Sequence, residues 1–388
     1  MRYVFLLLCC CLGFSGKAQT NTVITGAART GSYLPLLEGR RVALLVNQTA
    51  TIGHTHLVDS LLALHVKVVK IFSPEHGFRG NADAGEHVNN STDEKTGLPI
   101  VSLYGAHRKA TAANLADVDI LVFDIQDVGA RFYTYISSLQ ELMESAAENH
   151  KPLLVLDRPN PNGGYVDGPI LDTAFRSFVG MQPIPLVHGM TTGEYARMLN
   201  GEKWLAGKAR CTLTVISCLH YTHHTRYDIP VRPSPNLPNA AAVYLYPSLC
   251  LFEGTPISVG RGTDKPFQQF GSPLFPDTLY HFTPKSMPGA KTPVLQDQVC
   301  YGFDLSGDAG TIYQKYGQQL QLQWLLTAYR LYPDKARFFT PFFDKLAGGT
   351  QLREQVSSGK TAAEIRASWA PGLERFKAIR KKYLLYAE

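Results

Sequence analysis

Beyond about residue 40, short apolar runs alternate along the chain with segments of helical spacing. Nearly continuous apolar runs predict five strands, over residues 41–50, 66–74, 98–105, 117–129 and 151–161. Apolar residues repeating with a helical period predict helices over residues 56–64 and 135–150. Strands without polar alternation are typical of a parallel sheet that is covered on both faces. The pattern therefore predicts an α/β fold built on a parallel sheet.

The pattern of predicted strands and helices changes near residue 290. A strand is predicted over residues 298–306, followed by a long helix over 312–333 and a further helical segment over 361–386. We expect a main domain over residues 19–290 and a smaller C-terminal α+β domain over residues 291–388.

The first residues, "MRYVFLLLCCCLGFSGKAQT", have the layout of a secretory signal. One arginine precedes an apolar stretch over residues 3–14, and small residues follow it. We expect a signal peptide over residues 1–18 and an exported, periplasmic protein. Cys9, Cys10 and Cys11 keep a lipoprotein anchor open as the alternative, although no small-residue pair precedes any of them.

Charge, hydrophobicity and cysteine content exclude several classes of protein. The formal charge of +6 is spread along 388 residues apart from the basic stretch 375–382, which is typical of a solvated helix face, so no nucleic-acid partner is expected. No later segment is apolar and long enough for a transmembrane segment. Four cysteines remain after the signal and are expected to be buried free thiols: Cys211, Cys218, Cys250 and Cys300.

Known cofactor motifs are missing from the sequence. No G-x-G-x-x-G follows the first predicted strand, and no Walker-type G-x-x-x-x-G-K-[ST] occurs. The histidines at 54–56 and 220–224 lack the spacing of common zinc motifs. We therefore expect no cofactor and no metal.

The densest polar cluster is "KIFSPEHGFRGNADAGE", residues 70–86. It follows the second predicted strand, and open α/β sheets bind ligands beyond the carboxyl ends of their strands. Pro74 makes a turn that presents Glu75 and His76. Glu75 is a candidate general acid or acceptor for a sugar hydroxyl. The alternative is a carboxylate that caps a helix or pairs with Arg79.

A second cluster, "FDIQDVGARFYTY", covers residues 123–135. Carboxylate, amide and aromatic groups together suit a sugar, because hydroxyls need acceptors and the ring face packs on aromatic side chains. The alternative is that Asp127 caps a helix beginning near Arg131 while Tyr133 and Tyr135 pack in the core.

Three further loops carry candidate residues. "LDRPNPNGG" and "RPSPNLPN" present Asp157, Arg158, Asn160 and Asn236, and an ion pair between Asp157 and Arg158 is the structural alternative. "EGTPISVGRGTDKPFQQFGSP" places Arg261 between two glycines, where the free backbone suits close approach to an anion. A structural role, in a pair with Asp264, remains the alternative for Arg261.

These motifs occur in a characteristic order: "LVNQT", "FSPEHGFRG", "TGLPIVSLYG", "VFDIQDVGARFYTYI", "LDRPNP", "HGMTTGE", "PSPNLPN" and "EGTPISVGRGTDKPFQQFGSP". In this order they resemble the exo-β-N-acetylmuramidase family (NamZ-like), formerly a domain of unknown function. The resemblance runs from about residue 40 to the C-terminus. It implies a Rossmann-like domain without a dinucleotide, a smaller C-terminal domain and a cleft between them. It also implies release of N-acetylmuramic acid from the non-reducing end of peptidoglycan-derived glycans.

The resemblance implies Glu75 as the leading catalytic carboxylate. If two side chains carry the chemistry, we nominate Asp127 as the partner of Glu75, with Glu86 and Glu253 behind it. The expected substrate-binding residues are Asn47, Gln48, His76, Arg79, Glu86, Arg131, Tyr133, Asp157, Arg158, Asn160, His188, Asn236, Glu253 and Arg261. A cation is expected for the lactyl carboxylate, with Arg79 and Arg261 as the first candidates.

Several questions stay open from the sequence. The acetamido group could assist as an internal nucleophile, and a covalent glycosyl-enzyme or inversion are the other routes. A non-catalytic periplasmic binding protein for cell-wall glycans is the rival function. An esterase or amidase lacks a nucleophile motif, because no G-x-S-x-G occurs.

Overall fold

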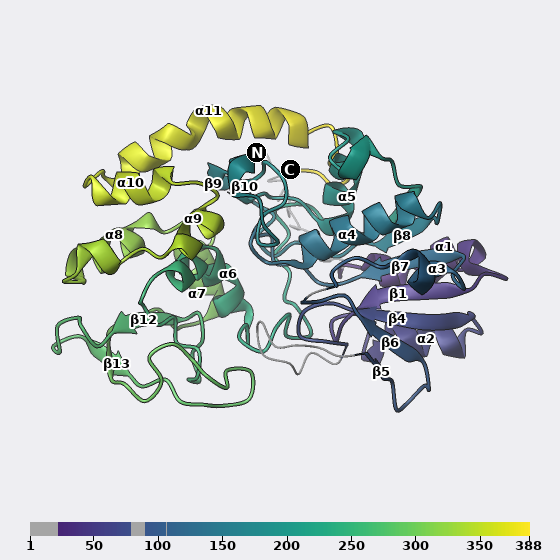
Figure 1. Cartoon of the computed structure of the whole chain (residues 1–388), viewed down its shortest axis with the longest axis horizontal. Helices are drawn as coiled ribbons and strands as arrows, with labels where there is room; N and C mark the ends of the chain where they lie inside the picture. Colours follow the sequence, from purple (N-terminus) through teal and green to yellow (C-terminus); the bar gives the residue numbers. More distant parts are fainter. Residues whose placement is uncertain (1–21, 79–89, 106) are drawn as a thin grey trace, which may run out of the picture.

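The computed structural model describes residues 22–78, 90–105 and 107–388. Its largest element is a seven-stranded sheet, seen at the right of Figure 1. In spatial order the strands are β11 (Leu213–Ile216), β8 (Leu153–Leu156), β7 (Ile120–Asp124), β1 (Val42–Val46), β4 (Val68–Ser73), β6 (Pro99–Ser102) and β5 (Ser91–Thr92). Neighbouring strands are parallel except β5, which pairs antiparallel with β6. The predicted α/β fold with a parallel sheet is confirmed.

Helices cover both faces of this sheet, and β1 shows why. Its residues are all buried but alternate between two hydrophobic cores. Val42 and Leu44 pack in a core with α1 (Thr30–Leu37) and α2 (Leu57–Ala63). Ala43 and Leu45 belong to a larger core that contains α4 (Tyr135–Glu148) and α5 (Thr192–Gly201). A strand buried on both faces needs apolar side chains at every position, which explains the continuous runs in the sequence.

Shorter elements connect these layers. The short helix α3 (Ala112–Leu115) precedes β7, and β9 (Asp167–Ile170) forms an antiparallel pair with β10 (Pro185–Val187). A small hairpin joins β2 (Thr51–Ile52) to β3 (Thr55–His56). The 3₁₀ helices span Gly26–Ala28, Thr173–Phe175, Ala206–Lys208, Cys250–Gly254 and Lys335–Arg337.

The second part of the molecule, at the left of Figure 1, combines helices with a three-stranded antiparallel sheet. The sheet has the order β12 (Gln269–Ser272), β14 (Cys300–Asp304) and β13 (Tyr280–Phe282). The helices are α6 (Ala240–Leu249), α7 (Ala309–Tyr316), α8 (Leu322–Leu331), α9 (Pro341–Ala347), α10 (Gln351–Ser357) and α11 (Ala362–Arg380). The expected boundary near residue 290 stays a prediction; β12 and β13 precede it and β14 follows it.

The single helix predicted over residues 312–333 is wrong in its continuity. Helix α7 ends at Tyr316, with Gly317 as its cap, and α8 starts at Leu322, six residues after Tyr316. Glycine has a low helix propensity, because fixing its flexible backbone in a helix costs conformational entropy, so it favours a helix end. The apolar spacing nevertheless continues through the break, which made two helices look like one. The helix predicted to run to residue 386 ends at Arg380.

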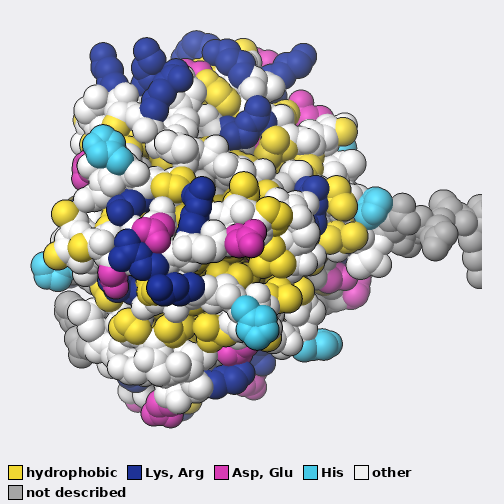
Figure 2. Space-filling model, turned by 90° about the vertical axis from the view of Figure 1, so that its right-hand side faces the viewer, with side chains coloured by type: hydrophobic (Ala, Val, Ile, Leu, Met, Phe, Trp, Pro, Cys, Tyr) yellow, Lys and Arg dark blue, Asp and Glu magenta, His cyan; other side chains and the backbone are white. Residues whose placement is uncertain are grey.

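Helix α11 ties the two parts together, running along the top of the molecule in Figure 1. Its last residue, Arg380, is buried and donates from Nε to the carbonyl oxygen of Gly189 at 3.0 Å. Its neighbours Arg375, Lys377, Lys381 and Lys382 are exposed. Figure 2 shows lysine and arginine side chains gathered at the same upper edge of the molecule, as expected for a solvated basic face.

The cysteine prediction is confirmed, because Cys211, Cys218, Cys250 and Cys300 are free and buried. Within the described ranges, no helix combines the length and apolar character needed to cross a membrane. Across the same residues, no group of three or more His, Cys, Asp or Glu side chains could hold a metal ion.

Candidate active site

Glu75 is presented by a tight turn at the carboxyl end of β4. The strand ends at Ser73, and the amide of Gly77 donates to the carbonyl oxygen of Pro74 at 3.0 Å. His76 adopts a positive φ of 68° inside this turn, a conformation that is uncommon outside glycine. The turn brings both Glu75 and His76 to the lining of a cavity.

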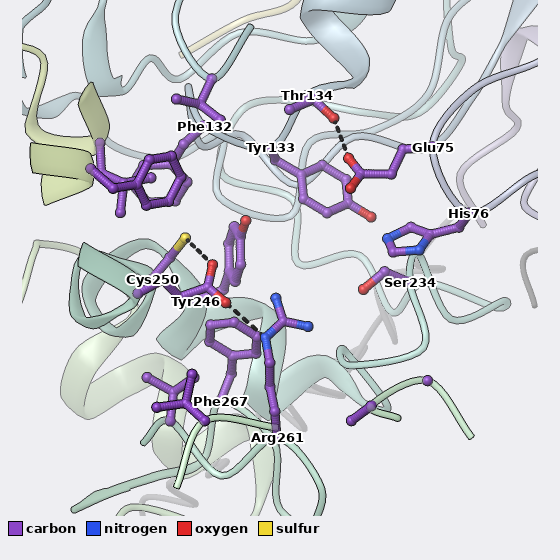
Figure 3. A pocket seen from close by; sticks show the side chains of 18 of the residues that line it. Glu75, His76, Phe132, Tyr133, Thr134, Ser234, Tyr246, Cys250, Arg261 and Phe267 are labelled. Carbon is purple, nitrogen blue, oxygen red and sulfur yellow. Dashed lines mark hydrogen bonds and ion pairs between the residues drawn. The ribbon is translucent and has the colours of Figure 1, made fainter. Parts of the chain in front are cut away.

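Two hydroxyl groups fix the Glu75 carboxylate. Tyr104, just after β6, donates from Oη to Oε1 at 2.8 Å. Thr134, the residue before α4, donates from Oγ1 to Oε2 at 2.9 Å, the bond drawn as a dashed line in Figure 3. Hydrogen bonds from hydroxyls to a carboxylate are stronger than those between neutral groups. Each oxygen therefore has its own donor, and the carboxylate plane is set by three separate segments of the chain.

The cavity has a volume of about 510 Å³, which lies within the range of small-molecule sites. One wall comes from the ends of the parallel sheet and carries Glu75, His76 and Tyr104. The opposite wall comes from the second part of the molecule and carries Glu253, Arg261 and the segment 289–294. The site therefore lies between the two parts of the protein, beyond the carboxyl ends of β4 and β6.

Aromatic side chains make the apolar surface of the cavity. Tyr246 lies at the centre, with ring centroids 5.4 Å from Phe132, 5.7 Å from Tyr133 and 4.9 Å from Phe267. All three contacts are edge-to-face, an arrangement that keeps the rings rigid. Such a surface suits the apolar face of a sugar ring, while the acidic residues around it can accept hydrogen bonds from the sugar hydroxyl groups.

An ion pair stands on the wall opposite Glu75. Arg261 donates from Nε to Oε1 of Glu253 at 2.7 Å, and the thiol of Cys250 lies 3.4 Å from Oε2 of Glu253. The guanidinium carbon of Arg261 lies 4.9 Å from the centroid of Phe267. Gly260 has a φ of +79°, and a Cβ there would meet the Gln269 side chain at 2.7 Å. Gly260 therefore lies in a close-packed turn that positions Arg261, and this turn is not the flexible loop expected from the sequence.

The cavity brings together five of the residues predicted from the sequence: Glu75, His76, Tyr133, Glu253 and Arg261. Arg79 and Glu86 lie outside the described residues. The remaining nine do not line the cavity: Asn47, Gln48, Asp127, Arg131, Asp157, Arg158, Asn160, His188 and Asn236.

Asp127 does not line the cavity. Its Oδ2 accepts from the amide of Gly129 at 2.7 Å, so it shapes the turn and does not cap α4, whose first residue is Tyr135. Its Oδ1 has no hydrogen-bond partner within the described parts of the chain. Burial raises the pKa of Asp127 to about 7. This carboxyl group is therefore placed to act on the fold and not on a ligand in this cavity.

His188 is the neighbour of Asp127, with Nε2 3.9 Å from Oδ2. Its Nδ1 accepts from the amide of Met190 at 3.2 Å, which assigns the ring proton to Nε2. Burial lowers the pKa of His188 to about 3, so the ring is neutral. The pair is a neutral imidazole facing a carboxyl group that burial keeps protonated up to about pH 7.

Two of the candidate arginines are structural. Arg158 forms a two-point ion pair with Asp124, at 2.5 Å from Nε and 2.8 Å from Nη2. Arg131 is fully buried, and its guanidinium donates to the carbonyl oxygens of Pro169, Ile184 and Leu346. Neither side chain reaches the cavity. Of the arginines proposed for the lactyl group, Arg261 is the one that the described chain places in it.

Several motif residues position the cavity lining from behind. Gln48 donates from Nε2 to the carbonyl oxygens of Arg232 and Pro233 at 3.0 and 3.2 Å. Tyr133 donates to the same Pro233 oxygen at 2.8 Å, so both hold the segment that carries Ser234. Asn236 donates to the carbonyl oxygen of Gly289 at 2.7 Å and thereby anchors the segment 289–294.

The other three candidates stabilise turns and a helix end. Asn47 accepts from the amide and hydroxyl of Thr49, and Asn160 donates to the carbonyl oxygen of Met190. Asp157 accepts from the amide of Gly193 at 2.8 Å, at the start of α5. Burial raises the pKa of Asp157 to about 6. The ion pair considered between Asp157 and Arg158 is wrong, because Arg158 pairs with Asp124.

Sequence reasoning missed lining residues of two kinds. Tyr104 and Thr134 were inside quoted motifs but were not assigned to the site; their polar side chains directly beyond β6 and before α4 were the available signal. Arg108, Phe178 and the segment 289–294 also line the cavity. They carry no motif, and nothing in the sequence brings them near Glu75.

Comparisons with known proteins agree with this architecture. The family model "Exo-beta-N-acetylmuramidase NamZ, N-terminal" matches residues 42–241, and its C-terminal counterpart matches residues 244–386. The chain belongs to the NamZ family. The peptidoglycan β-N-acetylmuramidase NamZ of Bacillus subtilis (strain 168) is 41% identical over 375 residues, which cover 91% of this chain and 89% of that relative.

Two solved structures from Bacteroides fragilis NCTC 9343, both described as DUF1343 family proteins, have the same fold. One is 49% identical with a TM-score of 0.87 and covers 95% of this chain and 99% of its own. The other is 30% identical with a TM-score of 0.78 and covers 94% and 99%. The two family models meet between residues 241 and 244, at the start of α6.

Proposed function

We propose that the protein is an exo-acting glycoside hydrolase that releases N-acetylmuramic acid from the non-reducing end of peptidoglycan-derived glycans. The observation that carries the proposal is the Glu75 carboxylate, held by two hydroxyls in a cavity of about 510 Å³, in a chain of the NamZ family. The 41% identity to the peptidoglycan β-N-acetylmuramidase of Bacillus subtilis supports the choice of substrate.

Glu75 is the group that exchanges a proton with the glycosidic oxygen. Its carboxylate faces the cavity, and general acid–base catalysis requires such direct reach. When Glu75 gives up its proton, Tyr104 and Thr134 already point their hydroxyl groups at the two oxygens. These donors stabilise the carboxylate that forms as the bond to the leaving group breaks.

The second carboxylate on the described cavity lining is Glu253, and Asp127 is not on it. Both Glu253 oxygens already have neighbours, Arg261 Nε and the Cys250 thiol. We assign Glu253 to holding Arg261. The comparison of Glu253→Gln with Glu75→Gln tests this assignment. If Glu253 is a nucleophile or a base, Glu253→Gln should lower turnover as much as Glu75→Gln does. If Glu253 only positions Arg261, Glu253→Gln should lower turnover less.

The assay that tests the function uses a chromogenic β-glycoside of N-acetylmuramic acid. Hydrolysis by the purified protein is expected, and a protein that binds the glycoside without releasing the chromophore would be a cell-wall glycan-binding module instead. Exo-action is tested with two glycan fragments that end in N-acetylmuramic acid or in N-acetylglucosamine at the non-reducing end. Only the first should lose a sugar.

We propose that the chain acts outside the cytoplasm, in the periplasm. The signal-like pattern of residues 1–18 and the extracytoplasmic origin of wall fragments support this location. Cell fractionation of a C-terminally tagged full chain is the test, with the N-terminus of the mature form expected at Gln19. A labelled fatty acid attached to the chain would point to the lipoprotein alternative.

A further inference from the structure

Arg261 presents the terminal nitrogens of its guanidinium group, Nη1 and Nη2, to the cavity. Its Nε is bound to Glu253, and within the described part of the chain no hydrogen bond involves Nη1 or Nη2. Figure 3 shows the guanidinium group pointing into the cavity, across from Glu75 and Tyr133. A guanidinium has five N–H donors, and the two terminal nitrogens match the two oxygens of a carboxylate.

The orientation of these two nitrogens is fixed. The carboxylate of Glu253 holds the Nε side, and the Phe267 ring lies 4.9 Å from the guanidinium carbon. The Arg261 side chain is 22% exposed. Arg108 and Lys291, which also line the cavity, are exposed. Arg261 is therefore the cation of the described lining that is best shielded from water, where an ion pair is least screened.

We propose that Arg261 binds the lactyl carboxylate of the N-acetylmuramic acid residue through its two terminal nitrogens and so sets the preference for this sugar over N-acetylglucosamine. The inference rests on the proposed function. The two sugars share the ring and the acetamido group, and the lactyl ether adds the one negative charge. A side chain that pairs with that charge discriminates between them, whereas groups that touch the shared ring do not.

The competing explanation gives Arg261 a purely structural role, in which its pair with Glu253 holds the turn at residues 260–262. This role predicts that loss of Arg261 harms every substrate equally. A role in binding the lactyl group predicts a loss that follows the charge of the substrate. The two explanations therefore separate on substrates that differ only at the carboxylate.

The test compares three glycosides with the same leaving group: N-acetylmuramic acid, its lactyl carboxamide and N-acetylglucosamine. With Arg261→Gln, kcat/KM for the carboxylate sugar should fall about 100-fold, as for a lost hydrogen-bonded charge. The kcat/KM for the carboxamide glycoside, and any residual kcat/KM for the N-acetylglucosamine glycoside, should change by less than about threefold. Arg261→Lys should recover part of the loss, because it keeps the charge without the two-point geometry.

Arg108→Gln is the matched control, since it removes an exposed cation from the same cavity. Its effect should be the same for the carboxylate and the carboxamide sugars. Equal losses on all three glycosides with Arg261→Gln, in a protein whose thermal unfolding is unchanged, would overturn the inference.

Binding measurements separate this inference from the proposed function. In the Glu75→Gln background, calorimetry with the disaccharide of N-acetylmuramic acid and N-acetylglucosamine reports affinity without turnover. Adding Arg261→Gln should weaken binding of the carboxylate form and leave the carboxamide form unchanged. If the wild-type protein hydrolyses nothing, the proposed function fails, and this comparison still decides the role of Arg261. Equal weakening of both forms would contradict it.

Discussion

The hydroxyl of Thr134 donates to Oε2 of Glu75 at 2.9 Å, although the two residues are 59 positions apart in the chain. Thr134 precedes α4, yet its side chain makes no capping hydrogen bond to that helix. Its hydroxyl is thus committed to the carboxylate. This relationship joins the end of one strand to the start of a helix that packs on the sheet, and it fixes the group on which the proposed chemistry depends.

Replacing Thr134 with valine should lower kcat about 10- to 100-fold with a smaller change in KM. Valine has the same shape but removes the donor to the carboxylate, and a hydrogen bond to a charged group contributes about 1.5–3 kcal/mol. Steady-state kinetics on the N-acetylmuramic acid glycoside are the measurement. Thr134→Ser keeps the hydroxyl and should retain most activity; a valine variant as active as the serine variant would remove Thr134 from the mechanism.

The buried ion pair of Asp124 and Arg158 should dominate stability in its region. Both side chains are almost fully buried, with exposures of 0% and 2%. Asp124→Asn should lower the free energy of unfolding by about 3–5 kcal/mol, because it leaves the arginine charge buried without its partner. Urea denaturation measures the loss.

Asp119→Asn is the control for that experiment. Its pair with Arg41 has a similar geometry, with Nη2 2.7 Å from Oδ1, but the two side chains are 36% and 40% exposed. Water and salt screen such a pair, so the loss should be much smaller. Equal losses in the two variants would show that burial does not set the strength of the Asp124 pair.

Asp127 should make stability depend on pH. Burial raises its pKa in the folded protein to about 7, from 3.8 in the unfolded chain. The stabilisation from the bound proton is complete below about pH 3.8 and is lost as the pH rises to about 7. Asp127→Asn removes this dependence. The unfolding free energy of the variant relative to wild type should therefore rise by about 3 kcal/mol between pH 4.5 and 7.5.

His188 does not disturb this comparison. In the folded protein its pKa is lowered to about 3, so the ring stays neutral over the whole window. In the unfolded chain it titrates equally in both proteins, and any packing cost of the asparagine adds a constant. Urea midpoints at the two pH values supply the measurement, and a difference that does not change with pH would show that Asp127 is ionised in the folded state.

The sequence predicted the sheet because a strand that is buried on both faces is apolar at every position, and such a run is easily recognised. The run at Val42–Val46 is apolar at every position, and both cores require it. The same reasoning placed Glu75 at the end of β4, where the cavity lies. Strand order was out of reach, because the position of β1 between β4 and β7 depends on how the connections cross the sheet and not on local spacing.

The site could be predicted only in part for a related reason. Asp127 and Glu75 both follow strands of one sheet, but a turn decides where each side chain points. Asp127 bends back to the amide of Gly129, while Glu75 follows a proline and reaches the cavity. The opposite wall comes from residues more than 150 positions later, and their approach to Glu75 depends on the packing of the two parts of the molecule.

The central claim, that Glu75 carries the proton transfer in a muramidase, is tested most directly by Glu75→Gln. The change keeps the shape of the side chain and its acceptor oxygen but removes the ionisable group. Release of N-acetylmuramic acid from its chromogenic glycoside should fall by at least about 10²-fold, while the affinity for free N-acetylmuramic acid is retained. A folded Glu75→Gln protein with near-normal turnover would contradict the account.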